Sequence, residues 1–154
     1  MLIVRFGLGD RAFGVLARDV REILPLCRTR PVPGTPAFVA GEFLLGGERV
    51  PLIDLRRWLD GEASRADLAT RMLLVDWQGP AGSGPVAFLA ERVRETVDVP
   101  RTAIAPRSVG EPGERVLGGS FVHDGVQVQL LEPSALLTTE LATLLYPPDV
   151  GSEP

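Results

Sequence analysis

The residue types that most often carry chemistry are scarce in this 154-residue chain. His123 is the only histidine, so a metal site built on imidazoles, or a Ser/His/Asp triad, would have to use it. It stands beside Asp124 and Gly125, a strong hairpin signal, and this predicts a surface position. Cys27 is the only cysteine and has no histidine near it in the sequence, so we interpret it as a small, partly buried thiol.

Glycines and carboxylates offer two further kinds of site, but neither forms a known motif. The paired glycines expose backbone amides, yet none has the spacing of a dinucleotide or Walker loop, and the chain contains no lysine. Two of the three carboxylates Asp54, Asp76 and Glu91 could form an acidic pair. Their spacing in the sequence does not bring them together, so only the fold could do so. Asp54 is placed to cap a helix. We therefore predict no catalytic residue, no metal site and no cofactor.

Composition and charge exclude several classes of partner. The formal charge is -4 and the pI is near 5.0, with acidic and basic residues interspersed, so no basic surface favours nucleic acid. No apolar run approaches the roughly 20 residues of a membrane helix, which predicts no direct membrane insertion. A single cysteine and an amino terminus without a secretory signal fit a reducing compartment. We predict a cytoplasmic protein.

The elements that must position these residues are centred on the stretch from Gly41 to Leu59. Apolar residues alternate from Glu48 to Leu55, which predicts a strand with a well-buried face. From Asp54 the spacing changes, because Leu55, Trp58 and Leu59 recur as on one face of a helix. The stretch therefore predicts a strand, a glycine turn, a second strand and the start of a helix.

The rest of the chain predicts short strands joined by turns, as its 17 glycines and 14 prolines indicate. Residues 18–24 predict one or two helical turns, with a strand as the alternative, and the proline-rich residues 30–36 predict an extended connector. Residues 78–85 and 100–114 predict loops, and a closing helix is expected from Pro133 until just before Pro147. The remaining predicted strands span 2–8, 12–16, 71–77, 86–93, 96–99, 115–123 and 126–131.

Five segments occur in an order that matches one protein family. They read FGLGDRAFGVLARDVREIL, PVPGTPAFVAG, RVPLIDLRRWL, VAFLAERVRETVDVP and GGSFVHDGVQVQLLEPSALL, and together they cover nearly all of residues 4–145. In this order and spacing the chain resembles the CheW-like domain family, the coupling scaffolds of bacterial chemosensory arrays. Each segment alone is a weak signal, and it is their succession that carries the resemblance.

The resemblance implies an all-β fold with minor helices, made of two intertwined five-stranded SH3-like β-barrels around a shared hydrophobic seam. Residues 1–146 are expected to form a single domain of two β subdomains, and residues 147–154 a flexible tail. It also implies a non-enzymatic adaptor in two-component signal transduction. Its partners would be the cytoplasmic tip of a chemoreceptor and the regulatory domain of a CheA-type histidine kinase, at membrane-associated arrays.

The same resemblance suggests which residues contact partners. Val20, Glu22 and Ile23 match the family's partner-contact element, and Gly41 and Leu45 match the turn region beside the receptor groove. Where the family commonly has N-L-R-G, this chain has LLGG, so glycine replaces an arginine whose charged fork it cannot mimic. The predicted partner-binding residues are Val20, Glu22, Ile23, Phe38, Gly41, Leu44, Leu45 and Gly46.

Three alternatives remain open at this point. The chain could be a divergent adaptor for a non-flagellar pathway, such as gliding motility, that binds the receptor but binds the kinase more weakly. It could instead be a small-molecule-binding or enzymatic β-barrel, which would require a closed pocket with convergent polar groups. Finally, Val20, Phe38, Phe43 and Leu45 could be core residues rather than contact residues.

Overall fold

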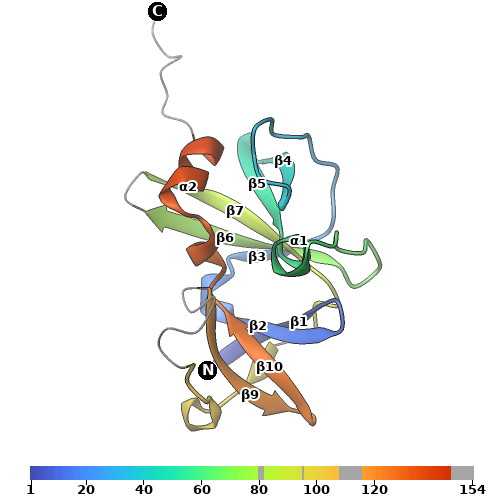
Figure 1. Ribbon diagram of the computed structural model, residues 1–154, viewed down its shortest axis with the longest axis vertical. Helices are drawn as coiled ribbons and strands as arrows, with labels where there is room; N and C mark the ends of the chain where they lie inside the picture. The colour runs from blue at the N-terminus through green and yellow to red at the C-terminus, as the bar shows by residue number, and fades with distance from the viewer. Residues whose placement is uncertain (80–81, 95, 108–115, 147–154) are drawn as a thin grey trace, which may run out of the picture.

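The computed structural model describes residues 1–79, 82–94, 96–107 and 116–146, and these form two five-stranded sheets stacked one above the other (Figure 1). The all-β class with minor helices is therefore confirmed. The first sheet has the order β8-β1-β2-β10-β9 and the second has the order β3-β6-β7-β5-β4. The strands are β1 (Leu2–Leu8), β2 (Arg11–Leu16), β3 (Glu22–Leu24), β4 (Val39–Leu45), β5 (Glu48–Asp54), β6 (Arg71–Gly79), β7 (Gly82–Ala90), β8 (Thr96–Asp98), β9 (Leu117–His123) and β10 (Val126–Leu131).

Both sheets follow the same plan. An antiparallel hairpin, β1–β2 or β6–β7, pairs in parallel with a strand of a second hairpin, β10–β9 or β5–β4. The register matches as well, because Phe6 pairs with Phe13 as Leu73 pairs with Phe88. All four side chains lie in the largest apolar cluster, between the two sheets, which we call the main core. This match allows positions in one sheet to be compared with positions in the other.

The two sheets are intertwined along the chain, as predicted. The first sheet uses strands from both ends of the described chain, whereas the second is built from the continuous segment between them. Among the described residues, only one isolated bridge closes each sheet: Ala105 with Ser120 of β9 in the first sheet, and Arg30 with Glu42 of β4 in the second. Neither sheet therefore closes into a continuously hydrogen-bonded barrel.

Three apolar clusters fill the molecule. The largest lies between the sheets and includes Phe6, Phe13 and Phe88, each of which contributes about 1.5–3 kcal/mol through burial. Each sheet also has a smaller core on its other face, because side chains alternate along a strand. The first sheet's own core is Ile3, Val99, Phe121 and Val128; the second sheet's own core is Phe43, Val50, Leu52, Met72, Leu74 and Ala87.

Short helices follow the parallel strand of each sheet. Helix α1 (Leu55–Asp60) begins after Asp54, whose carboxylate accepts a hydrogen bond from the Arg57 amide, so the predicted cap is confirmed. After β10 the chain forms the 3-10 helix η3 (Pro133–Leu136) and then α2 (Thr139–Leu145). The single closing helix predicted from Pro133 is thus wrong, because the extended backbone of Thr138 interrupts it and caps α2.

Residues 18–24 do not form the predicted helical turns. Only the 3-10 helix η1 (Ala17–Asp19) is present, and β3 follows as the strand that had been the alternative. The Arg21 amide donates to the Leu74 carbonyl, and β3 then pairs with β6. Sheet hydrogen bonds therefore satisfy this backbone instead of helical ones.

The described part of the loop predicted at 78–85 is strand instead, because β6 continues to Gly79 and β7 begins at Gly82. Trp77 stacks on Tyr146 with ring centroids 5.5 Å apart, which holds the extended end of β6 against the C-terminal segment. The predicted loop 100–114 contains the 3-10 helix η2 (Arg101–Ala103) and a bridge at Ala105. Residues 108–115 and the predicted flexible tail 147–154 lie outside the described residues.

Within the part of the chain that the structure describes, no helix is long and apolar enough to cross a membrane.

Candidate partner-binding surface

The predicted residues Val20, Glu22 and Ile23 lie together at one edge of the second sheet, and we call them the edge-strand surface. Within the described residues β3 pairs only with β6, so its other edge is unpaired. Ile23 is 43% exposed and Glu22 is also exposed, whereas Val20 is half-buried against the main core. An unpaired edge beside an exposed apolar side chain is a typical docking feature.

The opposite edge of the second sheet carries the β4–β5 hairpin, where Gly41, Leu44, Leu45 and Gly46 form what we call the hairpin surface. Leu44 is 67% exposed, while Leu45 packs against the second sheet's own core. Gly46 and Gly47 have φ values of 58° and 82° and form the two-residue turn between paired Leu45 and Glu48. Leu44 is therefore exposed next to a turn whose two residues carry no side chains.

Gly41 contributes to this surface through its backbone. It is buried, has a φ of 138°, and a Cβ there would lie 2.5 Å from the Arg30 carbonyl oxygen. The connector can approach β4 only because this residue has no side chain. The prediction that Gly41 takes part in partner binding stays a prediction, and the structure gives the residue a role in positioning β4.

A basic cavity of about 300 Å³ adjoins Leu44. Arg28, Arg30 and Arg49 line it around Glu42, whose carboxylate lies 3.9 Å from the Arg30 guanidinium and 3.8 Å from that of Arg49. Three guanidinium groups face one carboxylate, so this part of the hairpin surface favours an acidic partner segment. No local sequence pattern marks this cluster, although Arg28 and Arg30 stand close together in the chain.

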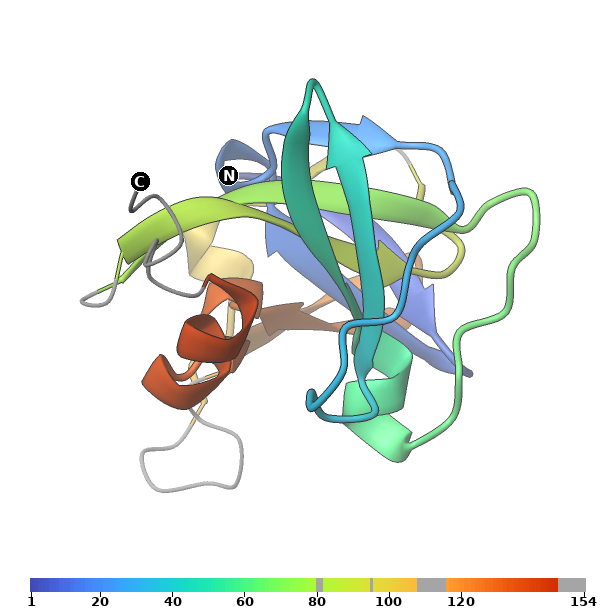
Figure 2. The same cartoon turned by 90° about the horizontal axis from the view of Figure 1, so that it is seen from above.

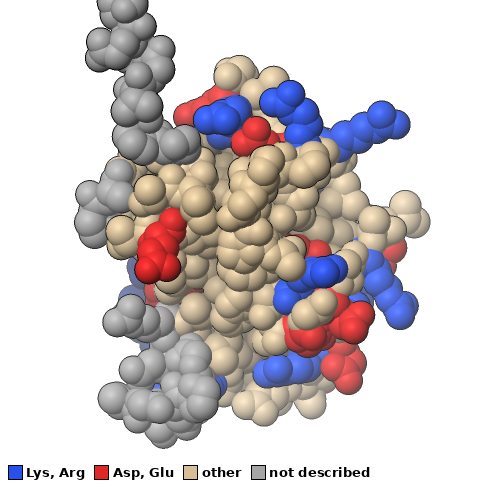
Figure 3. Space-filling model, turned by 45° about the horizontal axis from the view of Figure 1, so that its top comes forward, with Lys and Arg blue, Asp and Glu red and all other residues tan. Residues whose placement is uncertain are grey.

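Phe38 lies apart from both surfaces, in an apolar groove of about 320 Å³ between α1 and α2. Trp58 of α1 and Leu141 and Leu144 of α2 line the groove with it. Figure 2 shows the two helices on one side of the β6–β7 pair, and Figure 3 shows an uncharged central surface with charged side chains around its margin. Phe38 also packs against the main core, so it is half-buried.

The candidate chemical residues do not converge. Cys27 is exposed rather than partly buried, and partial desolvation raises the pKa of its thiol, which makes it a weaker nucleophile. His123 is half-buried, and its Nδ1 lies 2.8 Å from Arg5 Nη1. Among the described residues, no three histidine, cysteine, aspartate or glutamate side chains are grouped so that they could hold a metal ion.

Glu91 is the buried carboxylate that joins the two halves of the molecule, a role that the sequence did not reveal. It is 1% exposed and accepts hydrogen bonds from the Gly9 amide at 2.7 Å, the Arg65 amide at 2.6 Å and Arg56 Nη1 at 3.1 Å. Burial by itself raises the pKa of Glu91, but these hydrogen bonds outweigh it and hold the pKa below its ordinary value.

The other two carboxylates have separate roles. Asp54 caps α1 and also accepts hydrogen bonds from the Ser64 amide at 2.9 Å and the Ser64 hydroxyl at 2.5 Å. Asp76 is exposed and lies 3.2 Å from Arg21. Asp54 and Glu91 therefore fix the loop after α1, and the three carboxylates form no acid–base pair.

Known proteins match this chain along most of its length. FrzA of Myxococcus xanthus is 31% identical over 137 residues, which cover 87% of this chain and 83% of FrzA. The chemotaxis protein CheW of Rhizobium meliloti is 27% identical over 140 residues, which cover 90% of this chain and 88% of that protein.

A solved structure and a family model agree with these relatives. The crystal structure of the scaffolding protein TtCheW from Thermoanaerobacter tengcongensis has a TM-score of 0.74 at 22% identity, covering 85% of this chain and 83% of that one, so the two share a fold. The family model described as the CheW-like domain matches residues 2–141. The chain belongs to the CheW-like domain family.

Proposed function

We propose that this protein is a non-enzymatic adaptor that couples the cytoplasmic tip of a chemoreceptor to the regulatory domain of a CheA-type histidine kinase. The proposed setting is the cytoplasm, at membrane-associated chemosensory arrays. Family membership over residues 2–141 supports the proposal. The observation that carries it is the exposure of two large apolar side chains, Ile23 and Leu44, at opposite edges of one sheet.

Two separate surfaces suit an adaptor because it must hold two partners at once. The edge-strand surface has Ile23 as an apolar anchor, with the exposed ion pair of Arg21 and Asp76 nearby. The hairpin surface has Leu44 as its anchor beside the basic cavity. An apolar centre with a charged rim is typical of protein interfaces, and a few central anchors carry most of the binding energy.

The test measures binding of the full chain to a receptor tip fragment and to a kinase regulatory domain, each by isothermal titration calorimetry. Ile23→Asp and Leu44→Asp should each weaken binding to at least one partner about tenfold or more. The reason is that a charge replaces an apolar side chain that the partner would bury. The matched control is Leu68→Asp, since Leu68 is 94% exposed and lies on the loop after α1.

These two positions are better tests than Val20 or Leu45, because both of those side chains also pack against a core. Circular dichroism should show that all three variants fold. Unchanged affinity of both Asp variants for both partners would contradict the assigned surfaces, and binding of the unmodified chain to neither partner would contradict the function. A loss restricted to one partner in each variant would assign one surface to each partner.

A second candidate function is an adaptor for another chemosensory pathway that keeps the receptor contact and has a weakened kinase contact. Two observations favour it: Gly46 stands where the family commonly has arginine, and FrzA is among the relatives that match most of the chain. Gly46→Arg should then increase affinity for the kinase domain. A Cβ at Gly46 meets no atom within 4 Å, although its φ of 58° costs a side chain about 1 kcal/mol.

The receptor affinity of Gly46→Arg is the internal control for this second candidate. An increase for the kinase alone supports the weakened contact, whereas equal affinities before and after the substitution would contradict it.

A further inference from the structure

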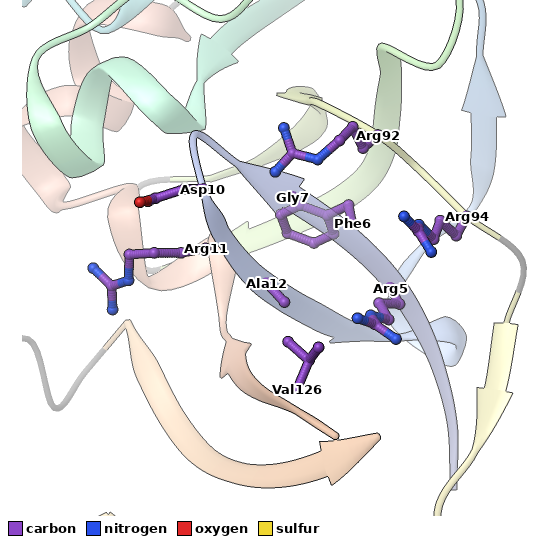
Figure 4. Close-up of a pocket in the computed structure, with 9 residues that line it drawn as sticks. All are labelled: Arg5, Phe6, Gly7, Asp10, Arg11, Ala12, Arg92, Arg94 and Val126. Carbon is purple, nitrogen blue, oxygen red and sulfur yellow. The ribbon is translucent and has the colours of Figure 1, made fainter. Parts of the chain in front are cut away.

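We propose that the first sheet carries an anion-binding site for the phosphate class, in which Arg5, Arg92 and Arg94 hold one compact oxyanion. These three arginines line a cavity of about 150 Å³ over β1 and β2. Arg11 and a single carboxylate, Asp10, also line it, but the Arg11 guanidinium lies over the Phe13 ring, 5.1 Å from its centroid. Figure 4 shows Arg5 beside Arg94 at one end and Arg11 beside Asp10 at the other. The site is separate from both proposed partner surfaces, which lie on the second sheet.

The cavity exists because the first sheet lacks side chains that the second sheet has. When Phe6 is aligned with Leu73, Arg5 takes the position of Met72 and Gly7 takes that of Leu74. Met72 and Leu74 are fully buried in the second sheet's own core. Where one sheet is filled by two apolar side chains, the other therefore has the guanidinium group of Arg5 and, over Gly7, that of Arg92.

Arg5 is a buried charge that its partner does not neutralise. Its side chain is 9% exposed, and its Nη1 lies 2.8 Å from His123 Nδ1. A guanidinium only donates, so an imidazole nitrogen beside it can only accept and supplies no negative charge. Among the described residues, no ion pair joins Arg5, Arg11 or Arg94 to a carboxylate. A buried charge without a counter-charge is costly, and a bound anion would remove that cost.

Arg92 is held over this cavity by an unusual backbone. Its φ is 44°, in the left-handed region that arginine rarely adopts, and such strain is typical of functional sites. Its guanidinium lies over Gly7, where any side chain would overlap it, and donates to the Gly9 carbonyl. Its only ion pair among the described residues is with Glu91, at 3.7 Å, and Glu91 also pairs with Arg56.

Charge and size define the ligand class. Four arginines and one aspartate give the lining a formal charge of +3 in a chain whose net charge is -4. Cavities of about 150 Å³ hold a molecule the size of benzene, so this one fits a compact anion and not a folded element. Guanidinium forks bind phosphate and carboxylate oxygens in pairs. A divalent phosphate group matches the charge better than a single carboxylate.

The test titrates the full chain with inorganic phosphate at constant ionic strength and near neutral pH, followed by NMR and by calorimetry. Glycerol 2-phosphate forms a second arm that distinguishes a phosphate monoester from free phosphate as the source. Acetate forms the third arm. The expected result is saturable binding of one or both phosphates, with shifts of the Gly7 and Ala12 amides and a raised melting temperature, and at least tenfold weaker binding of acetate.

Variants locate the binding. Arg5→Met places in the first sheet the residue that the second sheet has there, and Arg94→Gln removes an exposed arginine of the same cavity. Each should weaken phosphate binding about tenfold or more. Arg101→Gln is the control, because Arg101 is exposed on η2 and does not line the cavity.

Arg94→Gln keeps the test valid if Arg5→Met fails to fold. Absence of saturable phosphate binding, equal loss in the Arg101→Gln control, or acetate binding as tight as phosphate would each overturn the proposal.

Discussion

The two sheets share their topology and register, yet they differ in what fills the face that points away from the main core. In the second sheet six buried apolar residues occupy that face, including Met72 and Leu74. In the first sheet four apolar residues occupy it, and Arg5 and Gly7 take the matching positions. The shared main core and the strand pairing therefore define the fold, whereas each sheet's own core is free to change its chemistry.

The two sheets also differ in what they expose. The second sheet exposes Ile23 and Leu44 at its two edges, which suits protein partners. The first sheet also exposes apolar side chains, those of Leu2, Val122 and Val126, but it differs in holding most of the arginine-lined cavity. Under the two proposals, a fold built twice on one plan carries two kinds of recognition, and the following substitutions test how far the sheets are equivalent.

The largest effect is expected when the second sheet receives the first sheet's arginine. Met72→Arg should cost about 3–5 kcal/mol of unfolding free energy, because it places a charge among the apolar residues of the second sheet's own core. Urea unfolding followed by circular dichroism measures this cost. Leu68→Arg is the matched control and should change stability little. A cost below about 1 kcal/mol would show that the two faces are interchangeable.

Two glycines occupy matching places beside the isolated bridges and test the same comparison. A Cβ at Gly41 would lie 2.5 Å from the Arg30 carbonyl, and one at Gly119 would lie 2.5 Å from the Ala105 carbonyl. Only Gly41 also has a positive φ, of 138°. Gly119→Ala should cost about 1–3 kcal/mol through crowding, and Gly41→Ala should cost more because backbone strain is added. Equal costs in thermal unfolding would contradict this order.

Glu91 tests whether the two sheets unfold together. Glu91→Gln should lower the unfolding free energy by about 1–3 kcal/mol, since Arg56 loses its buried charge partner. Glu62→Gln is the control, because the Glu62 side chain is exposed. Both sheets should still unfold in one transition, and separate transitions by tryptophan fluorescence and circular dichroism would contradict this coupling.

The same residue predicts a pH dependence with a definite sign. The folded-state pKa of Glu91 lies below its ordinary value of 4.5, so unfolding takes up a proton in acid. The stabilisation from Glu91 is therefore fully present above pH 4.5 and is lost as the pH falls through the folded-state pKa. The unfolding free energies of the unmodified chain and of Glu91→Gln, measured as a function of pH, should converge at low pH. A difference between them that stays constant with pH would contradict the assignment.

The smallest effect is expected from exchanging the hairpin turns. Gly46→Asp gives the second sheet the Asp-Gly turn that the first sheet has at Asp124 and Gly125, where Asp124 adopts a φ of 52°. Because Asp tolerates this conformation, stability should change by less than about 1 kcal/mol. Thermal unfolding measures the change, and a larger loss would show that the two turns are not equivalent.

Local signals predicted much of this fold. The β1–β2 hairpin, the strand that ends at Asp54, its helix cap and the closing hairpin all have residue patterns confined to a few neighbours. The error at residues 18–24 has a physical cause. Val20, Ile23 and Leu24 fit helical spacing, whereas Val20, Glu22 and Leu24 fit strand alternation, and only pairing with β6 decides between them.

The sites were less accessible to sequence reasoning because they depend on distant contacts. Arg5 meets His123 across 118 residues of chain, and no local pattern marks a buried arginine in an apolar strand. Glu91 likewise acquires its role only when Gly9, Arg56 and Arg65 surround it. The partner-binding residues came from family resemblance, and the structure shows that Ile23 and Leu44 are exposed while Val20, Phe38 and Leu45 are half-buried.

The interleaved order of the strands also bears on how the protein forms during translation. The second sheet is complete once residue 90 has been synthesised, whereas the first sheet needs β10, which ends at Leu131. The β1–β2 hairpin therefore leaves the ribosome early and waits for its parallel partner, with the apolar side chains of β1 still uncovered. A nascent chain of this protein is most in need of chaperone protection while its middle is already folded and its beginning is not.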